Sequence, residues 1–235
     1  MIKDKIISQV ICILIYAVSF YLSYLLLSES ISHIWMKITL WHIYATLFIY
    51  IGSVILKNSS LYDPFWSVAP VPIVIYLAIN SDNSMLLKIL VTFPIIFWAA
   101  RLTRNWLISW RGFEHEDFRY IDLKNTNIYK AEFNNFFGIH LFPTLIVNIC
   151  LYPLVFIFLN SVEVTPFLYF ASIFTFMAVV LETVSDEQMR HFRNNPNNKG
   201  KTMKYKLWKY SRHPNYLGEI LFWFGICFMG LSSGF

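Results

Sequence analysis

A basic stretch near the end of the chain, residues 204–219 (KYKLWKYSRHPNYLGE), carries side chains suited to binding an anion. Proline has a fixed φ angle and no amide hydrogen, so Pro214 predicts the first position of a helix, with His213 as its cap. The free N–H groups of that first turn would lie beside Arg212, and together they favour a phosphate or pyrophosphate group. Arg212 and His213 are therefore candidate binding residues.

Two polar residues continue from this stretch into the apolar segment that follows. Asn215 and Glu219 are four residues apart, so they share one face of the predicted helix. An alternative is that the basic residues only flank a membrane span on its cytoplasmic side. That alternative accounts for the lysines, which fix topology, but it does not explain Asn215 and Glu219. We expect both to belong to the binding site.

A second polar face lies just upstream, in LETVSDEQMRHFR (residues 181–193). Its charged residues recur at spacings of four, four and three, which places them on one side of a helix. The carboxylates of Glu182 and Asp186 could contact ribose hydroxyls, and the guanidinium groups of Arg190 and Arg193 could contact phosphates. The alternative is an amphipathic helix with ordinary ion pairs. Glu182 argues against it, because a carboxylate near the end of an apolar span is costly unless it faces protein or a wet cavity.

Three arginines occur where the fourth apolar segment ends, in FWAARLTRNWLISWRGFEHEDFRY (residues 97–120). Arg101 and Arg104 are three residues apart, and Arg111 precedes Gly112. Lysines would serve equally well to fix the orientation of the segment in the membrane. The use of arginines beside tryptophans therefore predicts a cationic surface with defined positions. The alternative is that they are interfacial anchors.

An acidic residue precedes the proline-rich segment LYDPFWSVAPVP (residues 61–72). Asp63 lies beside a predicted break in the helix at the membrane surface, where a carboxyl group could orient or protonate a substrate carbonyl. The alternative is that Asp63 caps a helix that begins at Pro64.

Other polar residues predict structure rather than ligand binding. His42, His140 and Asn148 lie within apolar segments and predict hydrogen bonds between helices. His115 stands among acidic residues, but a consecutive charged run is typical of a solvated loop, so no metal site is predicted.

The composition predicts an all-α, polytopic membrane protein. Of 235 residues, 57% are apolar, 19% are aromatic and 14% are charged. The net charge of +5 would suggest a nucleic-acid partner in a soluble chain, but the distribution of the basic residues excludes one here. Cys12, Cys150 and Cys227 all lie in apolar segments without metal-ligand spacing, so neither a disulfide framework nor a zinc site is predicted.

About seven segments approach the length of about 20 residues that spans a membrane. They are residues 6–27, 38–56, 64–80, 85–109, 137–159, 164–184 and 216–235. Three prolines predict that the third segment is broken, kinked or re-entrant. With a cytoplasmic N-terminus, every Lys and Arg except Lys37 and Lys88 falls on the cytoplasmic side. The first segment lacks a small-residue cleavage site and predicts a retained span.

Four of these strings resemble those of the membrane steroid 5α-reductase-like proteins, and within them the bacterial DUF1295 group. The strings are SRHPNYLGE (211–219), SDEQMRHFR (185–193), DPFW (63–66) and RLTRNW…WRGFEHEDFRY (101–120). The resemblance runs from about residue 60 to the end. It divides the chain into N-terminal spans, residues 1–60, and the family's membrane domain, residues 61–235, which we expect to form one integrated unit.

The resemblance implies an enzyme of a bacterial inner membrane that binds NADPH in a cavity open to the cytoplasm. Its substrate would be a sterol-like or other lipid whose conjugated carbon–carbon double bond is reduced. The positions that match the family's cofactor-binding residues are Arg101, Arg111, Asp186, Arg193, Asn215, Tyr216 and Glu219.

The chain departs from the family pattern in two respects. Asp63 and Trp98 stand where the steroid enzymes use a Glu and a Tyr to hold the substrate ketone, and an indole cannot donate a phenolic proton. The family also continues through a further membrane segment and a basic, tyrosine-containing tail. We therefore expect the chain, which ends at Phe235, to be shortened relative to the family.

Two alternatives to the reductase remain open. The isoprenylcysteine carboxyl methyltransferases, which bind S-adenosylmethionine, share the Arg-His-Pro-x-Tyr-x-Gly string. A sulfonium ligand has no pyrophosphate for Arg193 and Arg212 to neutralise, which favours the dinucleotide. The other alternative is a membrane lipid-binding protein without turnover.

Overall fold

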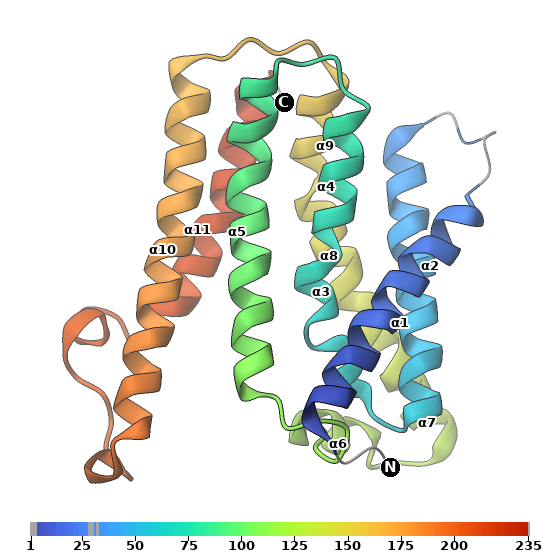
Figure 1. Ribbon diagram of the computed structural model, residues 1–235, viewed down its shortest axis with the longest axis vertical. Coiled ribbons are helices and arrows are strands. Elements are labelled where there is room, and N and C mark those ends of the chain that lie inside the picture. Colours follow the sequence, from blue (N-terminus) through green and yellow to red (C-terminus); the bar gives the residue numbers. More distant parts are fainter. Residues whose placement is uncertain (1–3, 28–30, 32, 235) are drawn as a thin grey trace.

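Helices account for all the regular structure in the computed structural model, which describes residues 4–27, 31 and 33–234 (Figure 1). This confirms the all-α prediction, and it follows from the membrane, where a helix satisfies every backbone polar group within its own segment. The helices of at least eighteen residues are α1 (Lys5–Leu25), α2 (Ile34–Leu56), α5 (Met85–Ser109), α10 (Pro166–Asn194) and α11 (Pro214–Leu231).

Six segments of the described chain are long and apolar enough to cross a membrane. They are Lys5–Leu25, Ile34–Leu56, Ser59–Ile79, Met85–Ser109, Ile128–Leu159 and Pro166–Asn194. The protein is therefore an integral, polytopic membrane protein. The seventh predicted segment forms α11, which begins at Pro214 with His213 before it, as expected; its first turn is polar, and it is not among the six.

Prolines divide two of these segments into shorter helices. The third segment consists of the 3-10 turn η1 (Ser59–Tyr62), α3 (Phe65–Val68) and α4 (Pro70–Ile79), which confirms that it is broken. The fifth consists of α7 (Ile128–Phe133), the π-helix η2 (Asn134–Leu141), α8 (Phe142–Cys150) and α9 (Tyr152–Leu159). The remaining elements are α6 (Phe118–Lys124), η3 (Pro196–Asn198) and η4 (Lys206–Lys209).

Two glycines bring α11 into close contact with α10. A Cβ atom at Gly218 would lie 2.8 Å from the Glu182 Cβ, and a Cβ atom at Gly225 would lie 2.1 Å from the Thr175 Oγ1. Only glycine permits this approach, as is common between membrane helices. The contact sets the polar start of α11 beside the carboxylates of α10.

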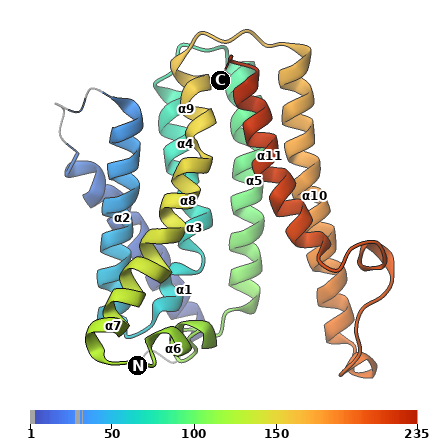
Figure 2. The ribbon, with the colours of Figure 1, turned by 180° about the vertical axis from the view of Figure 1, so that it is seen from behind.

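The basic segments gather at one end of the bundle. The start of α1, the end of α5, α6 and the connector between α10 and α11 all lie at this end, whereas the C-terminus lies at the other (Figures 1 and 2). This arrangement agrees with the charge distribution, which assigns both basic loops to the same side.

Candidate functional site

A buried ion cluster joins α5 to α10. Arg101 donates from Nη1 to Asp186 Oδ2 at 2.7 Å and from Nη2 to Glu182 Oε1. Asn105, one turn further along α5, donates from Nδ2 to the same Asp186 oxygen at 2.9 Å. Arg101 is only 5% exposed and is neutralised by two carboxylates. Its guanidinium group therefore positions Asp186. The resemblance implies that Arg101 binds the cofactor, but in this structure its Nη atoms are engaged with the two carboxylates.

Glu219 on α11 is held by two indoles. Trp98 donates from Nε1 to its Oε2 at 3.0 Å, and Trp223 donates from Nε1 to its Oε1 at 2.8 Å. Trp98 is fully buried and stacks on Phe222 with ring centroids 4.7 Å apart. Its side chain is committed to packing and to Glu219, and the structure does not bring it together with Asp63.

A polar cavity of about 370 Å³, the α10 cavity, opens beside this cluster between the ends of α5 and α10 and the start of α11. It is lined by Asn105, Ile108, Ser109, Asp186, Glu187, Met189, Arg190, Arg193, Asn194, Trp208 and Asn215. Four residues that the sequence analysis selects, Asp186, Arg190, Arg193 and Asn215, thus meet in one place.

The polar groups of the α10 cavity differ in how far they are already engaged. Arg190 forms an ion pair with Glu187, whereas Arg193 is exposed and no ion pair to it is present within the described residues. The Oδ1 atom of Asn215 is buried and has no hydrogen-bond partner in the described part of the chain. A buried acceptor without a protein partner is costly, so this atom can accept a hydrogen bond from a bound ligand or a water molecule.

The connector after α10 forms one wall of the cavity. Trp208 Nε1 donates to the Ser185 carbonyl at 3.1 Å, and the Leu207 amide donates to Gln188 Oε1 at 3.1 Å. These bonds fold the connector back onto α10. Nothing in the sequence pattern singled out Trp208 or Asn105 as part of the site.

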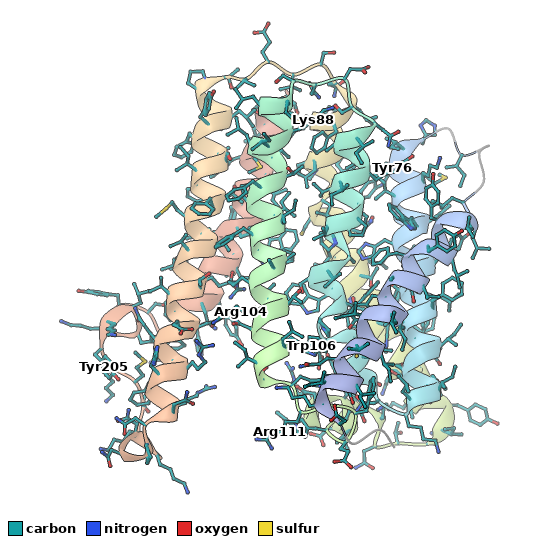
Figure 3. The ribbon with its side chains drawn as sticks, viewed as in Figure 1. Tyr76, Lys88, Arg104, Trp106, Arg111 and Tyr205 are labelled. Atoms are coloured by element: carbon teal, nitrogen blue, oxygen red, sulfur yellow. The ribbon has the colours of Figure 1, made fainter. Side chains whose placement is uncertain are left out.

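The remaining predicted binding residues lie outside the α10 cavity. Arg212, His213 and Tyr216 are exposed, and the rings of His213 and Tyr216 stack at 5.3 Å. Arg111 is exposed beyond the end of α5 (Figure 3). None of these four residues lines the α10 cavity beside Asp186 and Asn215.

A second polar cavity, the Asp63 cavity, lies on another side of the same end of α5. Its volume is about 350 Å³, and it is lined by Ser60, Asp63, Pro64, Trp66, Ser67, Leu102, Asn105, Trp106, Ser109, Trp110, His115 and Asp117. Asp63 Oδ1 accepts a hydrogen bond of 2.6 Å from the hydroxyl of Tyr120 on α6. Asp63 is therefore an oriented carboxylate facing a cavity.

Tyr120 was not predicted as a site residue, because it ends a charged run that is typical of a solvated loop. The run instead folds against η1: the Asp117 amide donates to Ser60 Oγ at 2.9 Å, and Arg119 pairs with Asp117 at 2.8 Å. Hydrogen bonds from Arg119 lower the pKa of Asp117. Burial, and next the charge of Asp63, raise the pKa of Tyr120, so the phenol stays protonated and keeps donating to Asp63.

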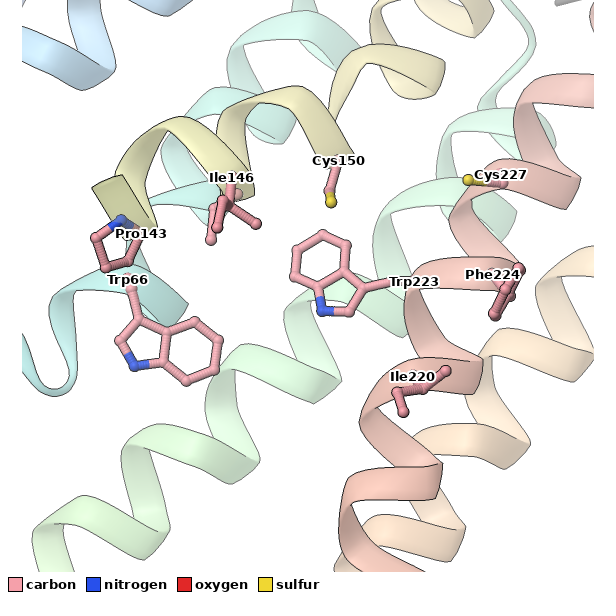
Figure 4. Close-up of a pocket in the computed structure, with 9 residues that line it drawn as sticks. Trp66, Pro143, Ile146, Cys150, Ile220, Trp223, Phe224 and Cys227 are labelled. Atoms are coloured by element: carbon pink, nitrogen blue, oxygen red, sulfur yellow. The ribbon is translucent and has the colours of Figure 1, made fainter. Parts of the chain in front are cut away.

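The Asp63 cavity shares walls with its neighbours. Asn105 and Ser109 line both polar cavities. Trp66 lines the Asp63 cavity and also an apolar cavity of about 450 Å³ between α8 and α11, where Trp66, Trp223 and Cys150 point toward one another (Figure 4). Next to α3, the polar Asp63 cavity thus adjoins an apolar cavity, and the side chain of Trp66 lines both.

The histidines within the spans have structural partners. His42 on α2 lies 3.5 Å from the amide of Asn148 on α8, which in turn accepts a bond from Thr39, and the predicted contact between helices is confirmed. The prediction for His140 is wrong, because its Nδ1 lies 2.8 Å from the Asn135 carbonyl within its own π-helix. Among the described residues, no group of three His, Cys, Asp or Glu side chains could hold a metal ion.

One family model matches the chain. It is described as "Protein of unknown function (DUF1295)" and covers residues 47–234, from the middle of α2 through α11. No curated protein and no solved structure matches the chain.

Proposed function

The chain is a polytopic membrane protein that belongs to the DUF1295 family, and we propose that it is an NADPH-dependent reductase of a conjugated carbon–carbon double bond in a lipid. The observation that carries the proposal is the pair of polar cavities that share Asn105 and Ser109 as a common wall. One cavity suits a phosphorylated cofactor, and the other suits the polar end of a substrate.

The α10 cavity fits a dinucleotide phosphate through three different groups. Arg193 offers an unpaired cation to a phosphate. Asp186 is a half-buried acceptor for a ribose hydroxyl, held in place by Arg101 and Asn105. Asn215 Oδ1 is a buried acceptor that a carboxamide or hydroxyl donor would satisfy.

The Asp63 cavity suits the reacting end of a substrate with an apolar body. Asp63 faces the cavity and is oriented by Tyr120. The indole of Trp66 leads from this cavity to the apolar cavity between α8 and α11, which can exclude water and hold hydrocarbon. A lipid with a polar, conjugated end fits a polar cavity that adjoins an apolar one.

The chemistry divides between the cofactor and these residues. NADPH, when bound, supplies a hydride to the β-carbon of the activated alkene. The α-carbon then needs one proton, and the titratable groups that line the Asp63 cavity are Asp63, His115 and Asp117. Asp117 is paired with Arg119, which leaves Asp63 and His115 as the groups that could hold the proton. Tyr120 is a positioning residue that fixes the Asp63 carboxyl group.

A second candidate is an S-adenosylmethionine-dependent methyltransferase. One observation favours it: Glu187 and Trp208 both line the α10 cavity, and a carboxylate and an aromatic ring are groups that attract a sulfonium cation.

Thermal unfolding of the detergent-purified protein distinguishes these candidates. A ligand at 100 times its Kd adds about 2.7 kcal/mol to the free energy of unfolding. We expect NADPH to raise Tm more than NADH and S-adenosylmethionine to have no effect. We also expect Arg193→Gln and Asn215→Ala to abolish the increase in Tm caused by NADPH. Lys201→Gln, which removes an exposed charge from the connector between α10 and α11, should preserve it.

Two outcomes would reject the reductase, and a third would change the role of Arg193. Stabilisation by S-adenosylmethionine alone would favour the methyltransferase, and no response to any of the three would favour a lipid-binding protein without turnover. A large loss of Tm in the unliganded Arg193→Gln variant would make this residue structural. A screen of lipid enones with NADPH oxidation as the readout then tests turnover directly.

A further inference from the structure

The largest of the described cavities belongs to neither polar site. It is a groove of about 710 Å³ between α1, the α3–α4 segment and α5, here called the α1–α5 groove. Its walls are almost entirely apolar, and its lining includes Ile13, Phe20, Val71, Ile96 and Leu107. Ile13 is 53% exposed and Ile96 is 38% exposed, so the groove is open along its side to the surroundings of the bundle, which are lipid.

The groove results from the way α1 is attached to α5. Lys5 Nζ donates to the Ile108 carbonyl at 3.0 Å, and Gln9 Nε2 donates to the Leu107 carbonyl at 2.8 Å. These bonds fix the start of α1 to the end of α5, and α1 then crosses the bundle obliquely toward α2 (Figure 1). Above the attachment the two helices diverge, and small side chains such as that of Ala100 leave the space between them open.

One cation lines this apolar groove. Arg104 stands in the lower half of α5 (Figure 3), five residues before the helix ends, which is about 8 Å along the axis. Arg101, three residues earlier, is buried and paired with two carboxylates, but Arg104 is exposed and forms no ion pair with any described acidic residue. A long side chain at this depth can carry its charge to the headgroup region.

From these features we propose that the α1–α5 groove binds an anionic phospholipid of the cytoplasmic leaflet. One acyl chain lies along the apolar walls, and the phosphate is held by the guanidinium group of Arg104. An open, apolar groove at membrane depth takes hydrocarbon, and an unpaired arginine at its headgroup end selects an anion, with which it forms two parallel hydrogen bonds. The proposal does not depend on the reductase activity.

Native mass spectrometry of the delipidated, full-length protein in a neutral detergent tests this site. Phosphatidylglycerol, phosphatidylcholine and oleate are each titrated, and the bound copies are counted. We expect phosphatidylglycerol to bind more tightly than phosphatidylcholine. Arg104→Gln should weaken the binding of phosphatidylglycerol about tenfold, because one charge-assisted contact is lost. Arg104→Lys keeps the charge but cannot form the two parallel hydrogen bonds, so its effect should be intermediate.

Two further variants test the contribution of the acyl chain and provide a control for charge. Ala100→Phe, at an exposed lining position, should block the groove and reduce binding as strongly as Arg104→Gln. Lys130→Gln removes an exposed charge on α7, at the same end of the bundle but outside the groove, and should change the affinity less than twofold. Equal effects of Arg104→Gln and Lys130→Gln, or equal binding of phosphatidylcholine, would overturn the proposal. Displacement of phosphatidylglycerol by an equal concentration of oleate would overturn the assignment to a phospholipid.

Discussion

The two polar cavities at the end of α5 hold their carboxylates in different ways. In the α10 cavity, Asp186 belongs to a buried cluster with Arg101 and Glu182 that ties two membrane helices together. In the Asp63 cavity, the carboxylate accepts hydrogen bonds from Ser60 of η1 and from the phenol of Tyr120, which lies on a short helix outside the membrane spans. Changes to the cluster in the α10 cavity should therefore reduce the stability of the whole bundle. Changes to Tyr120 should affect mainly the position of Asp63.

The largest effect on stability is expected when one member of the buried cluster is removed. Arg101→Met leaves two carboxylates without their cation, and we expect a loss of about 3–5 kcal/mol in the free energy of unfolding. Denaturant unfolding in detergent measures it. The matched change Arg104→Met, on the exposed side of the same helix, should cost about 0.5 kcal/mol or less. If the two variants were equally stable, the cluster would not hold the helices together.

A smaller effect is expected on the other side of α5. Tyr120→Phe removes one hydrogen bond to Asp63, which should cost about 1 kcal/mol of stability and lower turnover about tenfold. The shift in Tm caused by NADPH should be unchanged. Arg193→Gln should do the opposite, abolishing the NADPH shift without affecting the unliganded protein. A loss of the NADPH shift in Tyr120→Phe would show that the cavities do not have separate roles.

The smallest effect concerns pH. The pKa of Tyr120 is raised in the folded protein, so the unfolded phenol ionises first, at a pH of about 10. Its contribution to stability is fully present below that pH and is lost as the pH rises toward the folded pKa. The difference in Tm between the wild-type protein and Tyr120→Phe should therefore shrink between about pH 9 and pH 11. A constant difference would mean that the phenol is not held in its neutral form.

The same contrast explains what could be predicted from the sequence. The polar face of α10 follows from residue spacing, because one helix carries Glu182, Asp186, Arg190 and Arg193 at intervals of about one turn. Spacing does not reveal that Arg101, 81 residues from Glu182, pairs with it, since that contact depends on how two helices pack. In the sequence Arg101 is therefore predicted to belong to a cationic, cofactor-binding surface, whereas in the structure it is the counterion of two buried carboxylates.

The Asp63 cavity could be predicted only in part. Asp63 is visible beside its prolines, but Tyr120 lies 57 residues away in a charged loop whose folding against η1 leaves no periodic pattern. The π-helix Asn134–Leu141 is likewise invisible, because its apolar residues fit an ordinary helix equally well. Local periodicity thus gives the helices and their polar faces, whereas the contacts between segments need the three-dimensional packing.

The wall formed by Asn105 and Ser109 has one more consequence. Both side chains line the two polar cavities, so a ligand in either cavity can contact them. Ligands on the two sides of α5 would act on the same pair of side chains, and each would change the affinity for the other by the same factor. If both cavities bind ligands, Asn105 and Ser109 at the end of α5 would be the side chains through which their affinities are linked.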